Sequence, residues 1–159
     1  MAAGVVGAVY VAADAGEAPV AVGRVRAVPR SGLEGDRYFL GCGSFSRWPG
    51  TGRAMTLIEQ EAIDAVRREH ALDLGDGRSR RNLVTAGVDL AGLIGHTFRV
   101  GTALLRGERK AEPCGHLERH VGLGLIEALK GRGGLRAEVL EEGYSQPGDR
   151  IQVVGDGGA

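Results

Sequence analysis

Apolar and polar residues alternate with a period of two along several short stretches of the chain, which is typical of β-strands with one buried face. Phe98, Val100, Thr102 and Leu104 share one such face, and Ile151 and Val153 share another. We predict strands at residues 5–11, 20–28, 82–85, 97–105, 137–140 and 150–154. The 28 glycines are scattered without a fixed period, which indicates many turns between these strands.

Two other stretches have the spacing of a helix. The segment "TLIEQEAIDAVRREHAL" begins with Thr56 and Glu59 at the spacing of a capping box. Its apolar stripe, which we expect to cover the sheet, consists of Ile58, Ala62, Ala65 and Val66. A shorter helix is predicted over residues 124–130, ended by the glycines of "GRGG". Its inward residues are expected to be Leu125, Ile126 and Leu129.

Six or more strands with two or three helices, and no regular alternation of the two, predict a mainly β or α+β fold. We expect an antiparallel or mixed barrel-like sheet with a few covering helices. A chain of 159 residues, 43% of them hydrophobic, is long enough to bury one core. The prediction is therefore one domain over residues 1–159, with its core at about 5–154.

Charge and cysteine content exclude several classes of protein. The 20 basic and 20 acidic residues cancel, which argues against nucleic acid as a partner. Cys42 and Cys114 cannot build a disulfide framework, and a reducing compartment fits them best. The apolar N-terminal stretch has its first positive charge at Arg24, so it lacks the basic region of a secretory signal. No apolar stretch approaches the roughly 18 residues that span a bilayer. We expect a cytoplasmic protein without a membrane partner.

Two arginine-bearing segments are candidates for anion binding. In "LEGDRYFLGCGSF", Asp36 and Arg37 lie between glycines, where the backbone can approach a ligand and Arg37 can reach a phosphate. The alternative for this pair is a solvated turn. In "GDGRSRRNLV", Arg80 and Arg81 precede Asn82 and an apolar strand, so alternate side chains face opposite sides of the sheet. One arginine would then point into a pocket, with a salt-bridged strand entry as the alternative.

The segment "KAEPCGHLER" places Cys114 among basic residues. Lys110, His116 and Arg119 would stabilise a thiolate over a thiol, and the thiolate is the reactive form. Cys114, His116 and His120 also form C-x-H-x3-H, but a zinc site needs further ligands that the sequence does not offer. Acyl transfer, with Cys114 as nucleophile and His116 as base, is a further alternative for this segment.

Several segments together resemble one family, the MOSC domain, which takes its name from the C-terminal domain of molybdenum cofactor sulfurases. The resemblance spans about residues 5–154, and its most specific parts are the R-x-N-L-V block and the single cysteine downstream. The segments that carry it are "GLEGDRYFLGCGSFS", "MTLIEQEAI", "SRRNLVTAGVDLAGLIGHTFRVGTALLRG", "EPCGHLER", "RGGLRAEVLEEG" and "PGDRIQVV".

The resemblance implies a β-rich barrel and a molybdenum cofactor, molybdopterin. Cys114 would carry a persulfide or ligate the metal. In the amidoxime-reducing branch of the family, an arginine in each of two segments holds the pterin phosphate. These positions correspond to Arg37 and to Arg80 or Arg81, and Asn82 would orient the loop or the cofactor.

Two functional hypotheses follow from the resemblance. In the first, the protein is an enzyme: a molybdenum-cofactor-dependent oxidoreductase that reduces small N-hydroxylated compounds, or a sulfurtransferase that passes sulfur to the cofactor. In the second, it is a non-catalytic barrel that carries the cofactor or a sulfane sulfur. Either hypothesis implies a redox or sulfur-donor protein as a partner.

Overall fold

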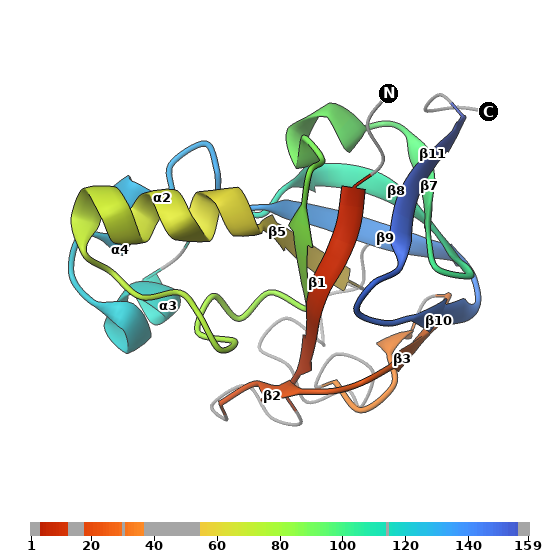
Figure 1. The fold of residues 1–159 in the computed structure, drawn as a ribbon, viewed down its shortest axis with the longest axis horizontal. Helices are drawn as coiled ribbons and strands as arrows, with labels where there is room; N and C mark the ends of the chain where they lie inside the picture. The colour runs from red at the N-terminus through yellow and green to blue at the C-terminus, as the bar shows by residue number, and fades with distance from the viewer. Residues whose placement is uncertain (1–3, 13–17, 30, 37–54, 114, 156–159) are drawn as a thin grey trace.

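The computed structural model describes residues 4–12, 18–29, 31–36, 55–113 and 115–155. Most of these residues form short strands, and the three α-helices lie together on one side of the molecule (Figure 1). The strands are β1 (Gly4–Val11), β2 (Val20–Ala21), β3 (Val25–Val28), β4 (Gly32–Leu33), β5 (Met55–Glu59), β6 (Leu83–Ala86), β7 (Thr97–Val100), β8 (Ala103–Lys110), β9 (Leu135–Glu141), β10 (Gly143–Ser145) and β11 (Arg150–Gly155). The helices are α2 (Gln60–His70), the 3-10 helix η1 (Leu90–Leu93), α3 (Gly115–Val121) and α4 (Leu125–Ala128).

In the described part of the chain, seven strands close into a barrel in the order β11-β7-β8-β9-β5-β6-β1, and β1 pairs again with β11. The pairing of β5 with β6 is parallel and the other barrel pairings are antiparallel. Strand β2 pairs antiparallel with the end of β1, and β10, β3 and β4 form a smaller sheet. The predicted mixed barrel is confirmed, whereas the single domain over residues 1–159 stays a prediction.

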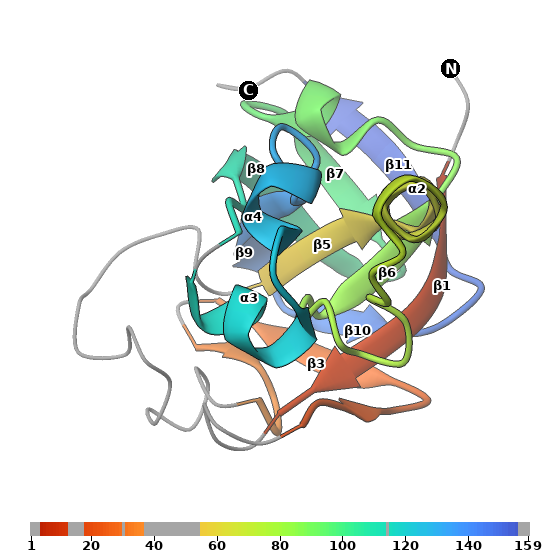
Figure 2. The same ribbon diagram turned by 90° about the vertical axis from the view of Figure 1, so that its left-hand side faces the viewer.

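Two hydrophobic clusters divide the molecule into layers. The first fills the barrel and includes the fully buried Phe98, Met55 and Leu57. The second lies outside the barrel, where Ile58 and Val84 pack against Ala62 and Val66 of α2 and against α3 and α4. Figure 2 shows these three helices in front of the sheet. Since β-strand residues alternate between faces, Met55 and Leu57 of β5 enter the barrel and Thr56 and Ile58 face outward.

The predicted helix over residues 56–72 is wrong at its start, because residues 55–59 form strand β5 and α2 begins at Gln60. Glu59, not Thr56, is the N-cap residue, and it makes no side-chain capping bond. The strand forms here because Met55 and Leu57 fill the barrel and Thr56 is hydrogen-bonded to Asn82, the residue before β6. The expected packing of Ala62 and Val66 on the sheet is nevertheless confirmed, with Ile58 contributing from the strand.

Other boundaries also differ from the prediction. The stretch 97–105 is a hairpin of β7 and β8, because the chain turns at Gly101, whose φ is 63°. The stretch 20–28 is divided between β2 and β3. In the region of α4, Leu125 and Leu129 are fully buried as expected, whereas Ile126 is 41% exposed, so its inward placement is wrong. Helix α3, which follows the position of Cys114, was not predicted. No helix in the described ranges is both long enough and apolar enough to cross a bilayer.

Candidate functional site

Asn82 joins three separate segments at the outer surface of the barrel. Its Oδ1 accepts hydrogen bonds from the Thr56 backbone N–H at 3.0 Å and from the Thr56 hydroxyl at 3.2 Å. Its Nδ2 donates to the Tyr10 carbonyl at 3.1 Å, and its own carbonyl accepts from the Tyr10 N–H at 2.7 Å. Asn82 is 6% exposed. Through its side chain and its main chain, Asn82 therefore links β1 and β5 at the position just before β6.

The same amide holds Asp36. Asp36 Oδ1 accepts from the Ala12 N–H at 3.0 Å and lies 3.4 Å from Asn82 Nδ2. Asp36 is only 1% exposed, so the solvated turn considered from the sequence is wrong for this residue. Its partner in that prediction, Arg37, lies outside the described residues. The contacts of Asp36 fix the chain at the position immediately before Arg37.

Arg80 lies in a tight loop directly before Arg81 and Asn82. Its φ is 57°, in the left-handed region that non-glycine residues seldom adopt, and its N–H donates to the Gly77 carbonyl at 2.9 Å. The Tyr10 ring packs against Gly77, where an added Cβ would lie 2.9 Å from the ring. Burial raises the pKa of the Tyr10 phenol, and the nearby Asp76 carboxylate raises it further, so Tyr10 stays neutral here. The loop is thus set by packing against β1, and Arg80 within it is 9% exposed.

Arg81 points to a different part of the molecule from Asn82. Its Nε donates to the Gly133 carbonyl at 2.9 Å, and its Nη2 donates to the carbonyls of Ala111 and Glu112 at 3.3 and 3.4 Å. Gly133 belongs to the turn before β9, while Ala111 and Glu112 follow β8. Arg81 is 8% exposed, and these contacts use its guanidinium to hold main-chain carbonyls.

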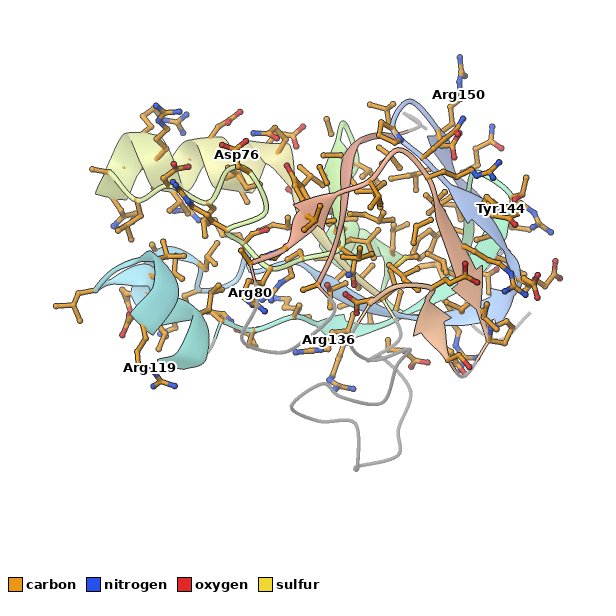
Figure 3. The ribbon with its side chains drawn as sticks, turned by 90° about the horizontal axis from the view of Figure 1, so that it is seen from below. Asp76, Arg80, Arg119, Arg136, Tyr144 and Arg150 are labelled. Carbon is orange, nitrogen blue, oxygen red and sulfur yellow. The ribbon has the colours of Figure 1, made fainter. Side chains whose placement is uncertain are left out.

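Arg136 is a neighbour of this site that the sequence reasoning did not single out. It pairs with Thr56 in the β9–β5 register, and Thr56 in turn bonds Asn82. Arg109 pairs with Arg136 on the next strand and, within the described residues, forms no ion pair. Figure 3 shows Arg80 and Arg136 on the same side of the molecule. The alternation in "GGLRAEV", which places Leu135 and Ala137 inside the barrel and Arg136 outside, was the available signal.

The predicted site residues are therefore brought together in part. Residues 80–82 contact both the residue before Arg37 and the segment before Cys114, but Arg37 and Cys114 themselves lie outside the described residues. The side chains of His116 and His120 lie outside them as well. Arg119 is exposed on α3 (Figure 3). No group of three or more His, Cys, Asp or Glu side chains that could hold a metal ion occurs in the part of the chain that the structure describes.

Lys110 lines a cleft of about 180 Å³. Two acidic residues, Glu59 and Asp89, line the same cleft together with Arg132. Glu59 is already engaged there, because its Oε2 accepts from the Leu90 N–H at 3.0 Å. The expected grouping of Lys110 with Cys114 and His116 stays a prediction, because Cys114 and the His116 side chain lie outside the described residues.

Comparison with known proteins relates this geometry to a family. The sequence profile of the MOSC domain matches residues 45–152. No curated protein matches the sequence of the chain. The fold is similar to that of the YuaD protein from Bacillus subtilis, with a TM-score of 0.75, 18% identity and 96% of each chain covered.

Two further crystal structures have a similar fold. YiiM from Geobacillus stearothermophilus has a TM-score of 0.71 and 16% identity, over 95% of this chain and 75% of that one. YiiM from Escherichia coli has a TM-score of 0.66 and 21% identity, over 97% of this chain and 70% of that one. At these identities the likeness concerns the fold.

Proposed function

The chain belongs to the MOSC domain family, and from this premise we propose that it binds the molybdenum cofactor, molybdopterin, through Cys114. The family is associated with this cofactor. We propose that the bound form acts in sulfur transfer or in the reduction of small N-hydroxylated compounds. The observation that carries the proposal is that residues 80–82 contact both the position before Arg37 and the segment before Cys114.

The donor groups of this site fit the chemistry of the cofactor. A soft thiolate such as that of Cys114 is a suitable ligand for molybdenum. A phosphate is held best by guanidinium groups, which donate two parallel hydrogen bonds. Arg80 and Arg37 are the residues that we assign to the phosphate. When bound, the cofactor supplies a metal centre that accepts sulfur or exchanges electrons with a substrate.

The other residues of the site have supporting roles in this proposal. Asn82 orients the chain before Arg37, because its amide nitrogen donates to Asp36. Its amide oxygen and nitrogen are both occupied by protein partners, so we assign it no direct contact with the cofactor. Arg136 and Arg109 add positive charge on the outer face of β8 and β9 and favour an anionic ligand nearby. A redox protein or a sulfur-donor protein is the partner that either activity requires.

Metal content tests the proposal. Protein produced in a host that makes the cofactor is analysed for molybdenum by mass spectrometry, for the wild type and for Cys114→Ser, Arg80→Asn and Arg78→Asn. A hydroxyl is a harder and much less acidic ligand, so Cys114→Ser is expected to lose the metal. Asparagine tolerates a left-handed backbone, so Arg80→Asn removes the guanidinium without new strain and is expected to lower the metal content.

Arg78→Asn is the matched control, because Arg78 lies in the same loop but is exposed and paired with Asp73. It is expected to keep the wild-type metal content. Full molybdenum content in Cys114→Ser would contradict the proposal. A reductase assay with an amidoxime and a chemical electron donor, together with detection of a Cys114 persulfide, then separates an enzyme from the second candidate, a non-catalytic carrier of the cofactor or of sulfane sulfur.

A further inference from the structure

A cleft of about 180 Å³ lies where β5, β8, η1 and the turn before β9 meet. Its charged lining consists of Glu59, Asp89, Lys110 and Arg132. Glu59 ends β5, Lys110 ends β8, and Asp89 directly precedes η1, while Arg132 belongs to the turn. The proposed cofactor site uses none of these four residues, so what the cleft binds does not depend on the proposed function.

The four charged groups line one cleft without neutralising one another. In the part of the chain that the structure describes, no ion pair joins either carboxylate to either cation. Glu59 and Arg132 are kept in place by other contacts. Glu59 Oε2 accepts from the Leu90 N–H at 3.0 Å. Arg132 donates through Nε to the Ala128 carbonyl at 2.9 Å and through Nη2 to Glu69 at 3.0 Å. These contacts use neither Glu59 Oε1 nor Arg132 Nη1.

Main-chain hydrogen bonds fix the walls of the cleft to the barrel. The Gly95 N–H, after η1, donates to the Gly107 carbonyl at 2.9 Å and ties η1 to β8. The Ala111 N–H, after β8, donates to the Gly134 carbonyl at 2.9 Å and ties the turn before β9 to the same strand. An added Cβ at Gly134 would clash with the Leu57 carbonyl oxygen, so the turn also lies directly against β5. The charges are therefore presented on a rigid frame that a ligand does not have to order.

The arrangement of charge decides which ligands suit the cleft. The carboxylates lie near each other, since Glu59 bonds the residue that follows Asp89. The cations belong to the end of β8 and to the turn that is bonded to it. A simple anion would be attracted by Lys110 and Arg132 but repelled by the carboxylates, and a metal cation would meet the reverse. The cleft is also smaller than the roughly 300–1,000 Å³ of sites for drug-sized ligands, so its ligand is small.

We propose that the cleft binds a small zwitterion, of the size of a free amino acid, which carries an ammonium and a carboxylate in one molecule. Lys110 and Arg132 Nη1 bind its carboxylate, and Asp89 and Glu59 Oε1 accept from its ammonium. Such charge-assisted hydrogen bonds are about twice as strong as neutral ones. Since each half of the ligand meets an opposite charge, a molecule with only one of the two groups binds more weakly.

The test is a titration of the isotope-labelled protein, followed by proton–nitrogen correlation spectra. The probes are glycine, β-alanine and γ-aminobutyrate, in which the ammonium and the carboxylate are increasingly far apart. Acetate and methylammonium, each with one of the two charges, are the single-charge probes. We expect the amide signals of Ala91, Gly131 and Gly134 to shift and saturate with at least one zwitterion. Its dissociation constant should be at least about tenfold lower than that of either single-charge probe, because charged hydrogen bonds form at both of its ends.

Two substitutions each remove one charge of the cleft. Lys110→Gln should weaken the binding of the zwitterion and of acetate, but not of methylammonium. Asp89→Asn should weaken the binding of the zwitterion and of methylammonium, but not of acetate. The zwitterion should lose about tenfold in affinity in each variant, the contribution expected of one charged hydrogen bond. Both side chains are exposed, so both variants are expected to fold, and the same spectra check this.

Lys130→Gln and Asp64→Asn are the matched controls. They make the same charge changes at exposed residues that do not line the cleft, and they are expected to keep the wild-type affinity. The proposal is wrong if none of the three zwitterions gives saturable shifts at the cleft, or if acetate or methylammonium binds as tightly as they do. An unchanged zwitterion affinity in folded Lys110→Gln or Asp89→Asn would overturn it as well.

Discussion

Replacing Asn82 by aspartate reverses half of the hydrogen bonds at the junction of β1, β5 and β6 while hardly changing the shape of the side chain. The oxygen that accepts from Thr56 remains, but the nitrogen that faces the Tyr10 carbonyl at 3.1 Å and Asp36 Oδ1 at 3.4 Å becomes a second oxygen. Two donor contacts therefore become contacts between acceptors. Asn82 and Asp36 are 6% and 1% exposed, so water cannot take over these contacts.

The size of the effect follows from these contacts. The unpaired Tyr10 carbonyl costs about 1–3 kcal/mol. Two carboxylates at this separation repel by up to about 5 kcal/mol at an effective dielectric constant of about 20, so one of them takes up a proton instead. We expect Asn82→Asp to lower the free energy of unfolding by about 3–5 kcal/mol at pH 7. For a chain of this length that corresponds to a fall in melting temperature of roughly 6–20 °C.

The loss should depend on pH in a defined direction. The introduced carboxyl has a folded pKa above its unfolded value of about 3.9, so its cost is absent below that pH and grows as the pH rises toward the folded pKa. Thermal unfolding followed by far-ultraviolet circular dichroism at pH 4 and pH 7 measures this, each variant being compared with the wild type at the same pH. Gln152→Glu adds the same charge on an exposed strand position and serves as the control. A fall of less than 2 °C at pH 7, or an equal loss at both pH values, would refute the reasoning.

Two further predictions concern the barrel away from this site. Phe98 is fully buried in the barrel, so Phe98→Ala should lower the free energy of unfolding by about 3–5 kcal/mol in urea titrations, whereas Val154→Ala, at a position 57% exposed, should change it by less than about 0.5 kcal/mol. Burial raises the pKa of Glu138, and the adjacent Glu108 carboxyl raises it further. Glu108 and Glu138 both pair with Arg106. The repulsion between the two carboxylates therefore grows as the pH rises above about 4.3, the usual pKa of a glutamate. The difference in free energy of unfolding between Glu108→Gln and the wild type should therefore favour the variant more at pH 7 than at pH 4. The opposite order would contradict this account.

The accuracy of the sequence predictions depended on whether a local signal or a distant contact decided the structure. The alternation in residues 97–105 and 150–154 was a local signal, and strands β7 and β11 form there, although β7 ends at Val100 and the chain turns back as β8. Thr56 and Glu59 matched a capping box, yet a hydrogen bond to Asn82, 26 residues away, places Thr56 in a strand. Nothing in the sequence around Thr56 shows this bond.

The pair of arginines in "SRRN" illustrates the same limit. Alternation predicted that neighbouring side chains of this segment face different ways, and it left open which arginine enters the site. The choice depends on the carbonyls of Gly133 and Ala111, which approach Arg81 only after β8 and β9 have paired. The left-handed backbone of Arg80 follows from a loop packed on Tyr10, which is also a tertiary contact.

The seam of the barrel has a consequence for how the chain is made in the cell. Gly4 and Val5 of β1 pair with Ile151 and Arg150 of β11, and Val6 bonds the turn just before β11. During translation, the ring cannot close until the ribosome has released β11, so β1 and β7 each keep an unpaired edge for most of synthesis. Such late, long-range closure slows folding and leaves apolar surface exposed to aggregation. A nascent chain that stalls before β11 would therefore be a natural substrate for chaperones and proteases.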